Sequence, residues 1–173
     1  MSDPEEISSR ALWKQWLVAA AQPDVHQAFM RLFDQLQKII DTHQPTCALS
    51  GCCCRFASYG HRLYLTGLEV AWTVRQLEIT SQRNLNQHDG DELTSHDGCP
   101  FQIQGMCSVH TVRPIGCRIY FCDPAAQTWQ PEIYEQMHQQ IQQLHQQHAL
   151  SYRYMEWRAA LADLLRCQRP AVQ

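Results

Sequence analysis

Residues 99–122 read Cys99-Pro-Phe-Gln-Ile-Gln-Gly-Met-Cys107-Ser-Val-His-Thr-Val-Arg-Pro-Ile-Gly-Cys117-Arg-Ile-Tyr-Phe-Cys122. A long helix or strand would not tolerate the glycines and prolines that this segment contains. A second cysteine-rich segment, Cys47-Ala-Leu-Ser-Gly-Cys52-Cys53-Cys54, lies upstream. We call residues 47–54 the first cysteine loop and residues 99–122 the second. Because the two loops hold all of the cysteines except Cys167, we expect them to fold onto one another around metal.

Length and charge limit the class of protein. At 173 residues the chain is long enough to bury a hydrophobic core without disulfides. We expect a single domain over residues 1–173, with N-terminal helices in 1–46, a cysteine-cluster core in 47–125 and C-terminal helices in 126–173. The formal net charge of −3, with the two signs interspersed, leaves no basic face, so we expect no nucleic-acid partner.

The chemistry of the cysteines depends on the compartment. The start, Met-Ser-Asp-Pro-Glu-Glu, is acidic and lacks the basic and apolar regions of a secretory signal, and no apolar run reaches the length of a membrane span. We therefore expect a cytoplasmic protein with no membrane partner. In a reducing cytosol, cysteine sets are more often metal-binding or catalytic than disulfide-bonded. A disulfide framework and a set of merely buried thiols are the alternatives.

Apolar periodicity predicts an all-α fold of about five helices that clamp the two cysteine loops. We expect helices over residues 5–21, from an N-cap at Asp24 to before Pro45, over 68–77, from Pro131 through Leu144, and from a cap at Ser151 to before Pro170. Thr66 and Glu69 have the spacing of a capping box for the third helix. The polar stretch 81–98 predicts a long loop, either an insertion or a lid.

The cysteine spacing differs from that of a simple zinc knuckle. The chain contains no C-x2-C pair, the loop that commonly brings two thiolates to one zinc ion. Adjacent side chains point in different directions in a regular backbone, so we do not expect Cys53 and Cys54 to share one tetrahedral ion. Two tetrathiolate sites, or one iron–sulfur cluster with spare thiols, both fit the number of cysteines.

The candidate metal ligands are Cys47, Cys52, Cys53, Cys54, Cys99, Cys107, Cys117 and Cys122. Four thiolates leave a zinc ion at net −2, and Arg55, Arg113 and Arg118 could offset that charge; the alternative is that they are ordinary surface cations. Glycines and prolines beside the thiols allow sharp, stiff turns. Cys167 lies outside the loops, and we expect it to be a small buried hydrophobe or an inert surface thiol.

The combined pattern resembles the YkgJ-type cysteine cluster proteins, the CxxCxxCC family, described as zinc- or iron-chelating domains. Their first motif reads approximately C-x2-C-G-x-C-C, often followed by a helix beginning Leu-Thr-x-x-Glu, and their second resembles C-P-F/L…G-x-C…R-P-x-x-C-R…C. The matching residues are Cys47, Gly51, Cys53, Cys54, Leu65, Thr66, Glu69, Cys99, Pro100, Phe101, Gly105, Cys107, Arg113, Pro114, Cys117, Arg118 and Cys122. Ser50 replaces the second cysteine of the first motif, and His110 stands where tyrosine is common, within chelating distance of Cys107 in sequence.

The resemblance implies that the cysteines bind a metal ion or cluster. The lack of C-x2-C pairs and the excess of thiols favour iron or an iron–sulfur cluster, with zinc as the alternative. Three functions remain open: a redox or accessory role, a structural zinc module for protein interaction, and metal delivery. Flagellin lysine methylases carry a similar cluster, but no further domain for a methyl donor is recognisable here. A Cys107–His110 nucleophile and a hard-metal site among the acidic and histidine residues of 88–97 are weaker alternatives.

Overall fold

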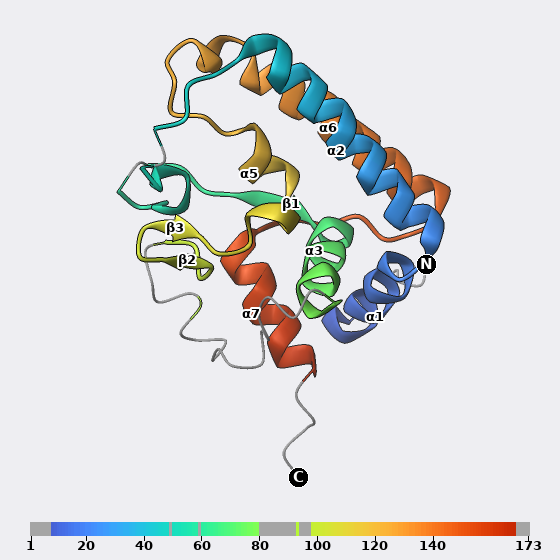
Figure 1. Ribbon diagram of the computed structural model, residues 1–173. Helices are drawn as coiled ribbons and strands as arrows, with labels where there is room; N and C mark the ends of the chain where they lie inside the picture. Colours follow the sequence, from blue (N-terminus) through green and yellow to red (C-terminus); the bar gives the residue numbers. More distant parts are fainter. Residues whose placement is uncertain (1–7, 49, 59, 80–92, 94–97, 169–173) are drawn as a thin grey trace, which may run out of the picture.

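The computed structural model describes residues 8–48, 50–58, 60–79, 93 and 98–168. This part of the chain is mostly helical, which confirms the all-α prediction (Figure 1). Its α-helices are α1 (Ser9–Ala20), α2 (Pro23–His43), α3 (Gly67–Ile79), α5 (Ile115–Ile119), α6 (Gln130–Gln147) and α7 (Trp157–Gln168). The strands are β1 (Tyr64–Thr66), β2 (Gln102–Ile103), β3 (Met106–Cys107) and β4 (Tyr154–Glu156), and the 3₁₀ turns are η1 (Cys52–Cys54), η3 (His110–Val112) and η4 (Ala126–Thr128).

Helix α1 is anchored by two buried tryptophans. It begins after Ser8, whose hydroxyl accepts from the Ala11 N–H at 3.3 Å; the expected start at residue 5 lies outside the described residues. The Trp13 indole donates to Asp163 Oδ2 of α7, and the Trp16 indole donates to the Ser151 carbonyl, both at 2.8 Å. Satisfying each indole N–H in this way lets the rings enter the core without an unpaired donor.

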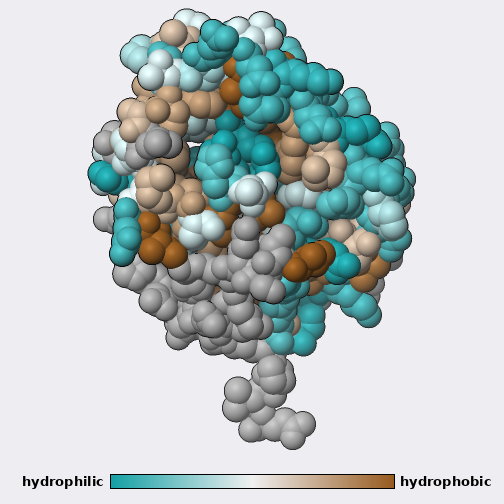
Figure 2. All heavy atoms as spheres, in the orientation of Figure 1, coloured by the Kyte–Doolittle hydropathy of each residue, from teal (hydrophilic) through white to brown (hydrophobic). Residues whose placement is uncertain are grey.

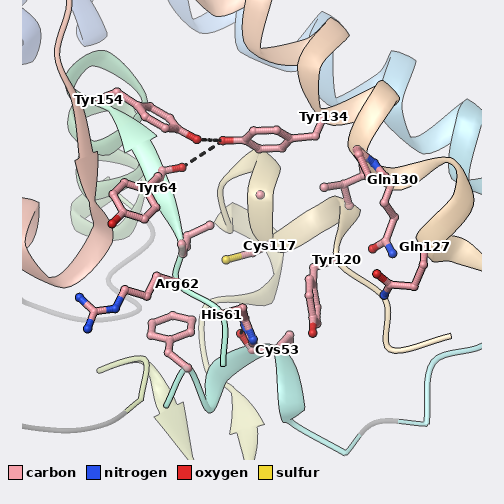
Figure 3. Close-up of a pocket in the computed structure, with 15 residues that line it drawn as sticks. Cys53, His61, Arg62, Tyr64, Cys117, Tyr120, Gln127, Gln130, Tyr134 and Tyr154 are labelled. Atoms are coloured by element: carbon pink, nitrogen blue, oxygen red, sulfur yellow. Dashed lines mark hydrogen bonds between the residues drawn. The ribbon is translucent and has the colours of Figure 1, made fainter. Parts of the chain in front are cut away.

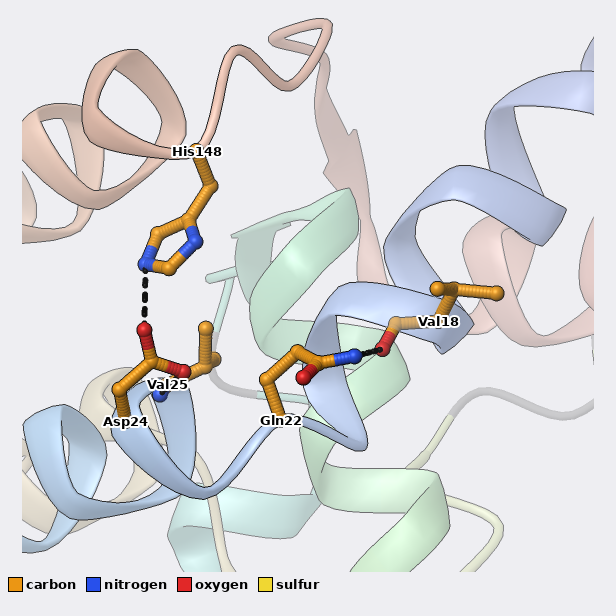
Figure 4. Close-up of polar contacts among 5 residues, drawn as sticks. All are labelled: Val18, Gln22, Asp24, Val25 and His148. Carbon is orange, nitrogen blue, oxygen red and sulfur yellow. Dashed lines mark hydrogen bonds and ion pairs between the residues drawn. The ribbon is translucent and has the colours of Figure 1, made fainter.

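Helices α2 and α6 lie side by side (Figure 1), and their outer side is largely hydrophilic (Figure 2). Asp24 is not the N-cap as predicted: Gln22 is, because Pro23 already occupies the first helical turn. Asp24 instead accepts from the Val25 N–H at 2.9 Å and lies 3.8 Å from His148, just beyond α6 (Figure 4). The start of α2 therefore meets the end of α6, and the helices are antiparallel. α2 ends at His43, which confirms the predicted end before Pro45.

Helix α3 occupies the centre of the fold. Its first residue, Gly67, lies so close to the Trp16 ring that a Cβ atom there would be 2.4 Å from the ring. The predicted capping box is confirmed: the Thr66 hydroxyl accepts from the Glu69 N–H at 3.2 Å, and the Glu69 carboxyl accepts from the Thr66 N–H. The buried Glu69 carboxyl also accepts from the Ile115 N–H at 2.8 Å. Glu69 thus anchors α5, a short helix that the sequence reading placed in an irregular loop.

Two small antiparallel sheets were not predicted. β1 pairs with β4, with Leu65 opposite Met155, so the expectation of a last helix from Ser151 is wrong and α7 begins only at Trp157. This pairing supplies hydrogen-bond partners to the backbone of β4, just before α7. The Trp157 N–H, at the start of α7, donates to the Leu63 carbonyl at 2.8 Å. β2 and β3 form a hairpin. Of the expected loop 81–98, only Leu93 and Gly98 belong to the described residues.

No helix in the described ranges is long and apolar enough to cross a membrane.

Candidate metal centre

The two cysteine loops are in direct contact. The Cys99 N–H donates to the Cys54 carbonyl at 2.7 Å, and the Gln102 side-chain amide donates to the carbonyls of Gly51, at 3.0 Å, and Gly105, at 3.1 Å. Gly51 has φ +68°, and a Cβ atom at this position would lie 2.1 Å from the Gly105 oxygen. The loops therefore approach so closely at Gly51 that a side chain there would collide with the β2–β3 hairpin.

Four thiols meet where the loops touch. The Cys54 thiol is hydrogen-bonded to the thiols of Cys53, Cys99 and Cys107. We call these four residues the inner thiol group. The expectation that Cys53 and Cys54 point apart rested on regular backbone, whereas here they lie in the tight 3₁₀ turn η1, where neighbouring thiols make contact. The structure brings Cys117 close as well, because its thiol interacts electrostatically with Cys99 and Cys107.

Hydrogen bonds among these thiols lower the pKa of three of them and raise the pKa of Cys54. Contact with the Cys54 thiol lowers the pKa of Cys53 to about 6 and that of Cys107 to about 6, and it lowers the pKa of Cys99. The same three hydrogen bonds raise the pKa of Cys54. Burial, then the neighbouring thiols, raises the pKa of Cys117 well above its usual value. The Cys54 S–H therefore acts as the donor that favours ionisation of its neighbours, while negative charge on Cys107 disfavours ionisation of Cys53 and Cys99.

Two buried donors adjoin the inner thiol group. The Trp157 indole N–H has no hydrogen-bond partner of ordinary geometry among the described residues, yet it lies near enough to the Cys99 thiol to contribute to its lowered pKa. The Arg113 Nε atom is also buried without a partner within the described ranges, and the Arg113 charge lowers the pKa values of Cys53 and Cys107. Both donors lie where negative charge on sulfur would be stabilised.

The remaining candidate cysteines, Cys47, Cys52 and Cys122, form an outer thiol group. The Cys122 thiol contacts the Cys52 thiol and interacts electrostatically with Cys47 and with Cys53 of the inner group. Ser50, which replaces a cysteine of the motif, donates its hydroxyl to Cys52 Sγ at 2.8 Å. Cys47 and Cys122 are exposed, whereas Cys52 is buried. The eight candidate ligands thus divide into the inner group with Cys117 and a more superficial group of three.

The other candidates are placed differently. Arg118 lies over the Phe33 ring, 3.9 Å from its centroid, and donates to the carbonyls of Arg113 and Thr111 at 2.8 and 2.7 Å. It braces the second loop against α2 by a cation–π contact. Arg55 donates to the Ser50 carbonyl at 3.1 Å, and His110 is exposed in η3. Cys167 lies on α7, partly buried against the core, which leaves it outside both thiol groups. Residues 88–92 and 94–97 are outside the described residues.

The donor set fits a thiolate-bound metal. In the described residues no three Cys, His, Asp or Glu side chains already converge as metal ligands do; the inner thiols contact one another as hydrogen-bonded groups. Binding would require loss of the remaining protons and rotation of the side chains. Four soft sulfur donors with a buried indole N–H and a buried guanidinium beside them have the composition of a zinc or iron–sulfur site.

A cleft of about 300 Å³ opens beside the inner thiol group (Figure 3). Cys53 and Cys117 line it, and its walls carry His61, Tyr64, Tyr120, Tyr134 and Tyr154. Figure 3 shows the Cys117 sulfur between the upper and lower aromatic side chains. Two of the candidate sulfur ligands, Cys53 and Cys117, therefore line an accessible cleft.

Sequence reasoning missed several residues of this site. Trp157 lies 35 residues after Cys122 and was only part of the range of the last predicted helix. Glu69 was predicted as a capping residue and matched the family pattern, but its hydrogen bond to Ile115 was not predicted. The tyrosines of the cleft come from β1, β4, α6 and the second loop, and no spacing in the chain connects them. No family model matches the chain, and neither a curated protein nor a solved structure does.

Proposed function

We propose that this chain is a cytoplasmic metal-binding protein whose inner thiol group, with Cys117, holds iron or an iron–sulfur cluster for a redox or accessory role. The observation that carries the proposal is the contact of the Cys54 thiol with Cys53, Cys99 and Cys107. These thiols come from two loops more than forty residues apart, which meet through backbone and side-chain hydrogen bonds. The resemblance to YkgJ-type proteins supports the same ligands.

The thiols, not the protein's charged surface, provide the chemistry of the site. The pKa values of Cys53 and Cys107, lowered to about 6, make a thiolate available near neutral pH, and the pKa of Cys99 is lowered as well. Trp157 and Arg113 offer donors to the sulfur atoms, and hydrogen bonds to sulfur tune the reduction potential of a bound cluster. When bound, a cluster would supply one-electron transfer, which thiols and helices alone do not.

The cleft favours a reactive centre over a purely structural one. Structural zinc sites are closed, with all four ligands from the protein and no approach for a solute. Here Cys53 and Cys117 line an accessible cleft. The structural zinc module and metal delivery remain the alternative functions, and the outer thiol group fits a second, more easily exchanged metal.

Anaerobic purification followed by metal and acid-labile sulfide analysis tests the proposal. We expect brown protein containing iron and sulfide. Colourless protein with stoichiometric zinc and no sulfide would overturn the redox proposal in favour of the structural module. Rapid transfer of the metal to an apo-acceptor, measured by gel filtration and metal analysis, would support delivery instead.

A further inference from the structure

The cleft beside the inner thiol group has the size and lining of a small-molecule site. Its volume of about 300 Å³ lies at the lower end of the range of roughly 300–1,000 Å³ that is typical of ligand pockets. Apolar and aromatic side chains provide most of its surface, and a few polar atoms interrupt them. Such a surface holds a ligand by shape and ring contact, with few directed hydrogen bonds.

Two stacked aromatic pairs form the walls. Tyr64 stacks on Tyr154 with centroids 5.6 Å apart and planes at 29°, and His61 stacks on Tyr120 at 4.5 Å and 19°. Tyr64 and Tyr154 are 40% and 41% exposed, so part of each ring can contact a ligand. A flat ring entering the cleft would cover their exposed faces by offset stacking.

The polar atoms of the cleft determine which substituents of a bound ring can form hydrogen bonds. The Tyr134 hydroxyl donates to the Tyr64 carbonyl at 3.1 Å and lies 2.6 Å from the Tyr154 hydroxyl. Since Tyr134 has one proton, already given to the carbonyl, Tyr154 donates to Tyr134 and keeps its own lone pairs for an incoming N–H or O–H.

The cleft carries charged groups of both signs. Among the described residues that line it are one arginine, Arg62, no aspartate or glutamate, and Cys53, whose lowered pKa of about 6 favours a thiolate. Arg62 lies at the edge of the cleft below Tyr64 (Figure 3). An anionic group at this edge would meet the Arg62 guanidinium, and repulsion from the Cys53 thiolate would keep the charged end of the ligand at the edge and its uncharged ring inside.

We propose that this cleft binds a planar aromatic anion of one or two rings, with its carboxylate or similar group toward Arg62 and its ring between the tyrosine and histidine walls. A ring hydroxyl or N–H would donate to Tyr154. The inference goes beyond the proposed metal centre, and it places the bound ring beside Cys53 and Cys117, two of the residues that would hold that centre.

Titration calorimetry on the anaerobically purified chain, with whatever metal it carries, tests the proposal with four probes. They are 6-hydroxy-2-naphthoate, 2-naphthoate, cyclohexanecarboxylate and 2-naphthylmethylammonium. We expect affinity to fall in that order, with the two naphthoates well ahead of the non-aromatic acid and the cation. Stronger binding of the cation, or equal binding of the non-aromatic acid, would overturn the proposal.

Variants locate the binding. Arg62→Gln should weaken 2-naphthoate binding by about two- to fivefold, as expected for an exposed charge pair, while Arg153→Gln, an exposed arginine that does not line the cleft, should leave it unchanged. Tyr154→Leu should weaken it by about three- to tenfold through the lost stacking, and Tyr152→Leu, an equally exposed tyrosine outside the cleft, should not.

Circular dichroism and metal content are measured on the same samples. Equal effects of Arg62→Gln and Arg153→Gln would overturn the proposal, even if Tyr154→Leu misfolds. Protein that keeps its metal but binds no naphthoate overturns this inference alone. Protein that binds naphthoate but carries no metal overturns the proposed function alone.

Discussion

The inner and outer thiol groups contain the same residue type in two different surroundings. The inner thiols lie between two hydrogen-bonded loops, Cys99 and Cys107 pack against the hydrophobic core, and Trp157 and Arg113 supply buried donors. In the outer group, Cys47 and Cys122 are exposed, and the nearest hydroxyl donor is Ser50. A site whose candidate ligands the fold already holds close together binds metal with less ordering cost than one carried on exposed residues. We therefore expect the inner metal to be the more tightly held and the more important for stability.

The largest effect should follow loss of an inner ligand. Cys99→Ser should abolish metal binding at the inner group and lower Tm by about 10 °C or more, because metal affinity contributes directly to folding free energy. Metal analysis and differential scanning calorimetry measure both effects. Cys167→Ser is the matched control and should change neither. Full metal content in Cys99→Ser and Cys117→Ser would contradict the assignment of the inner ligands.

The contact between the loops should be nearly as sensitive. Gly51→Ala forces a side chain into a positive-φ position and against the Gly105 oxygen, so we expect it to destabilise the fold by about 3 kcal/mol. Gly60→Ala provides the comparison, since Gly60 has φ +66° but nothing within 4 Å of its Cβ position; it should cost about 1 kcal/mol. Urea unfolding of both variants gives the difference. Equal costs would show that the close approach at Gly51 is unimportant.

Glu69 should make stability depend on pH. Burial raises its pKa to about 7 from the ordinary 4.5, against the N–H donors of Ile115 and Thr66. The folded chain thus binds this proton more tightly than the unfolded chain. The resulting stability is fully present below about pH 4.5 and is lost as pH rises through about 7, by up to about 3 kcal/mol.

Glu69→Gln isolates this dependence. The amide keeps an oxygen for the Ile115 N–H and cannot ionise, so the variant should gain stability over the parent chain as pH rises from 5 to 8. Urea unfolding at several pH values measures the difference between the two proteins, which removes the contribution of groups that they share. A difference that does not change with pH would contradict the buried ionisation. Glu69 accepts from the N–H of Ile115, the first residue of α5, and α5 carries Cys117. The test therefore also measures how firmly the fold positions Cys117.

The smallest effect should follow loss of an outer ligand. Cys122→Ser should remove only metal bound at the outer group and change Tm by less than about 2 °C, because the thiol is exposed. Metal content per chain, compared with that of Cys99→Ser, measures the division. If Cys122→Ser also empties the inner group, the two groups act as one site and the comparison fails.

The sequence predicted the parts of this fold that rest on local patterns. Apolar periodicity identified α2 and its end before Pro45, and breaker residues identified two irregular loops that the structure brings together. The pairing of β1 with β4 could not be predicted, because three-residue strands are too short to show alternation. Asp24 was misread because a proline in the first turn moved the cap to Gln22.

The same contrast between local patterns and tertiary contacts holds for the candidate site. The candidate cysteines could be recognised from their type and spacing. Their division into two groups could not, because it depends on which thiols lie in contact, and the turn η1 and the close approach at Gly51 determine those contacts. Glu69 could be matched to a helix start, whereas its bond to Ile115 joins residues that only the tertiary fold brings together. The ligand assignment itself stays a prediction.

The hydrogen bond between Cys99 and Cys54 closes the intervening chain into a loop of about 45 residues. A metal held by thiols on both sides would act as a crosslink at the base of that loop, and a crosslink of this span removes unfolded-state entropy worth about 4 kcal/mol in the chain-entropy account. The closure term grows only with the logarithm of length, so doubling the loop would cost about 0.6 kcal/mol. Residues added between the two cysteine loops, outside β1 and α3, would therefore change the closure cost of the metal centre only slightly.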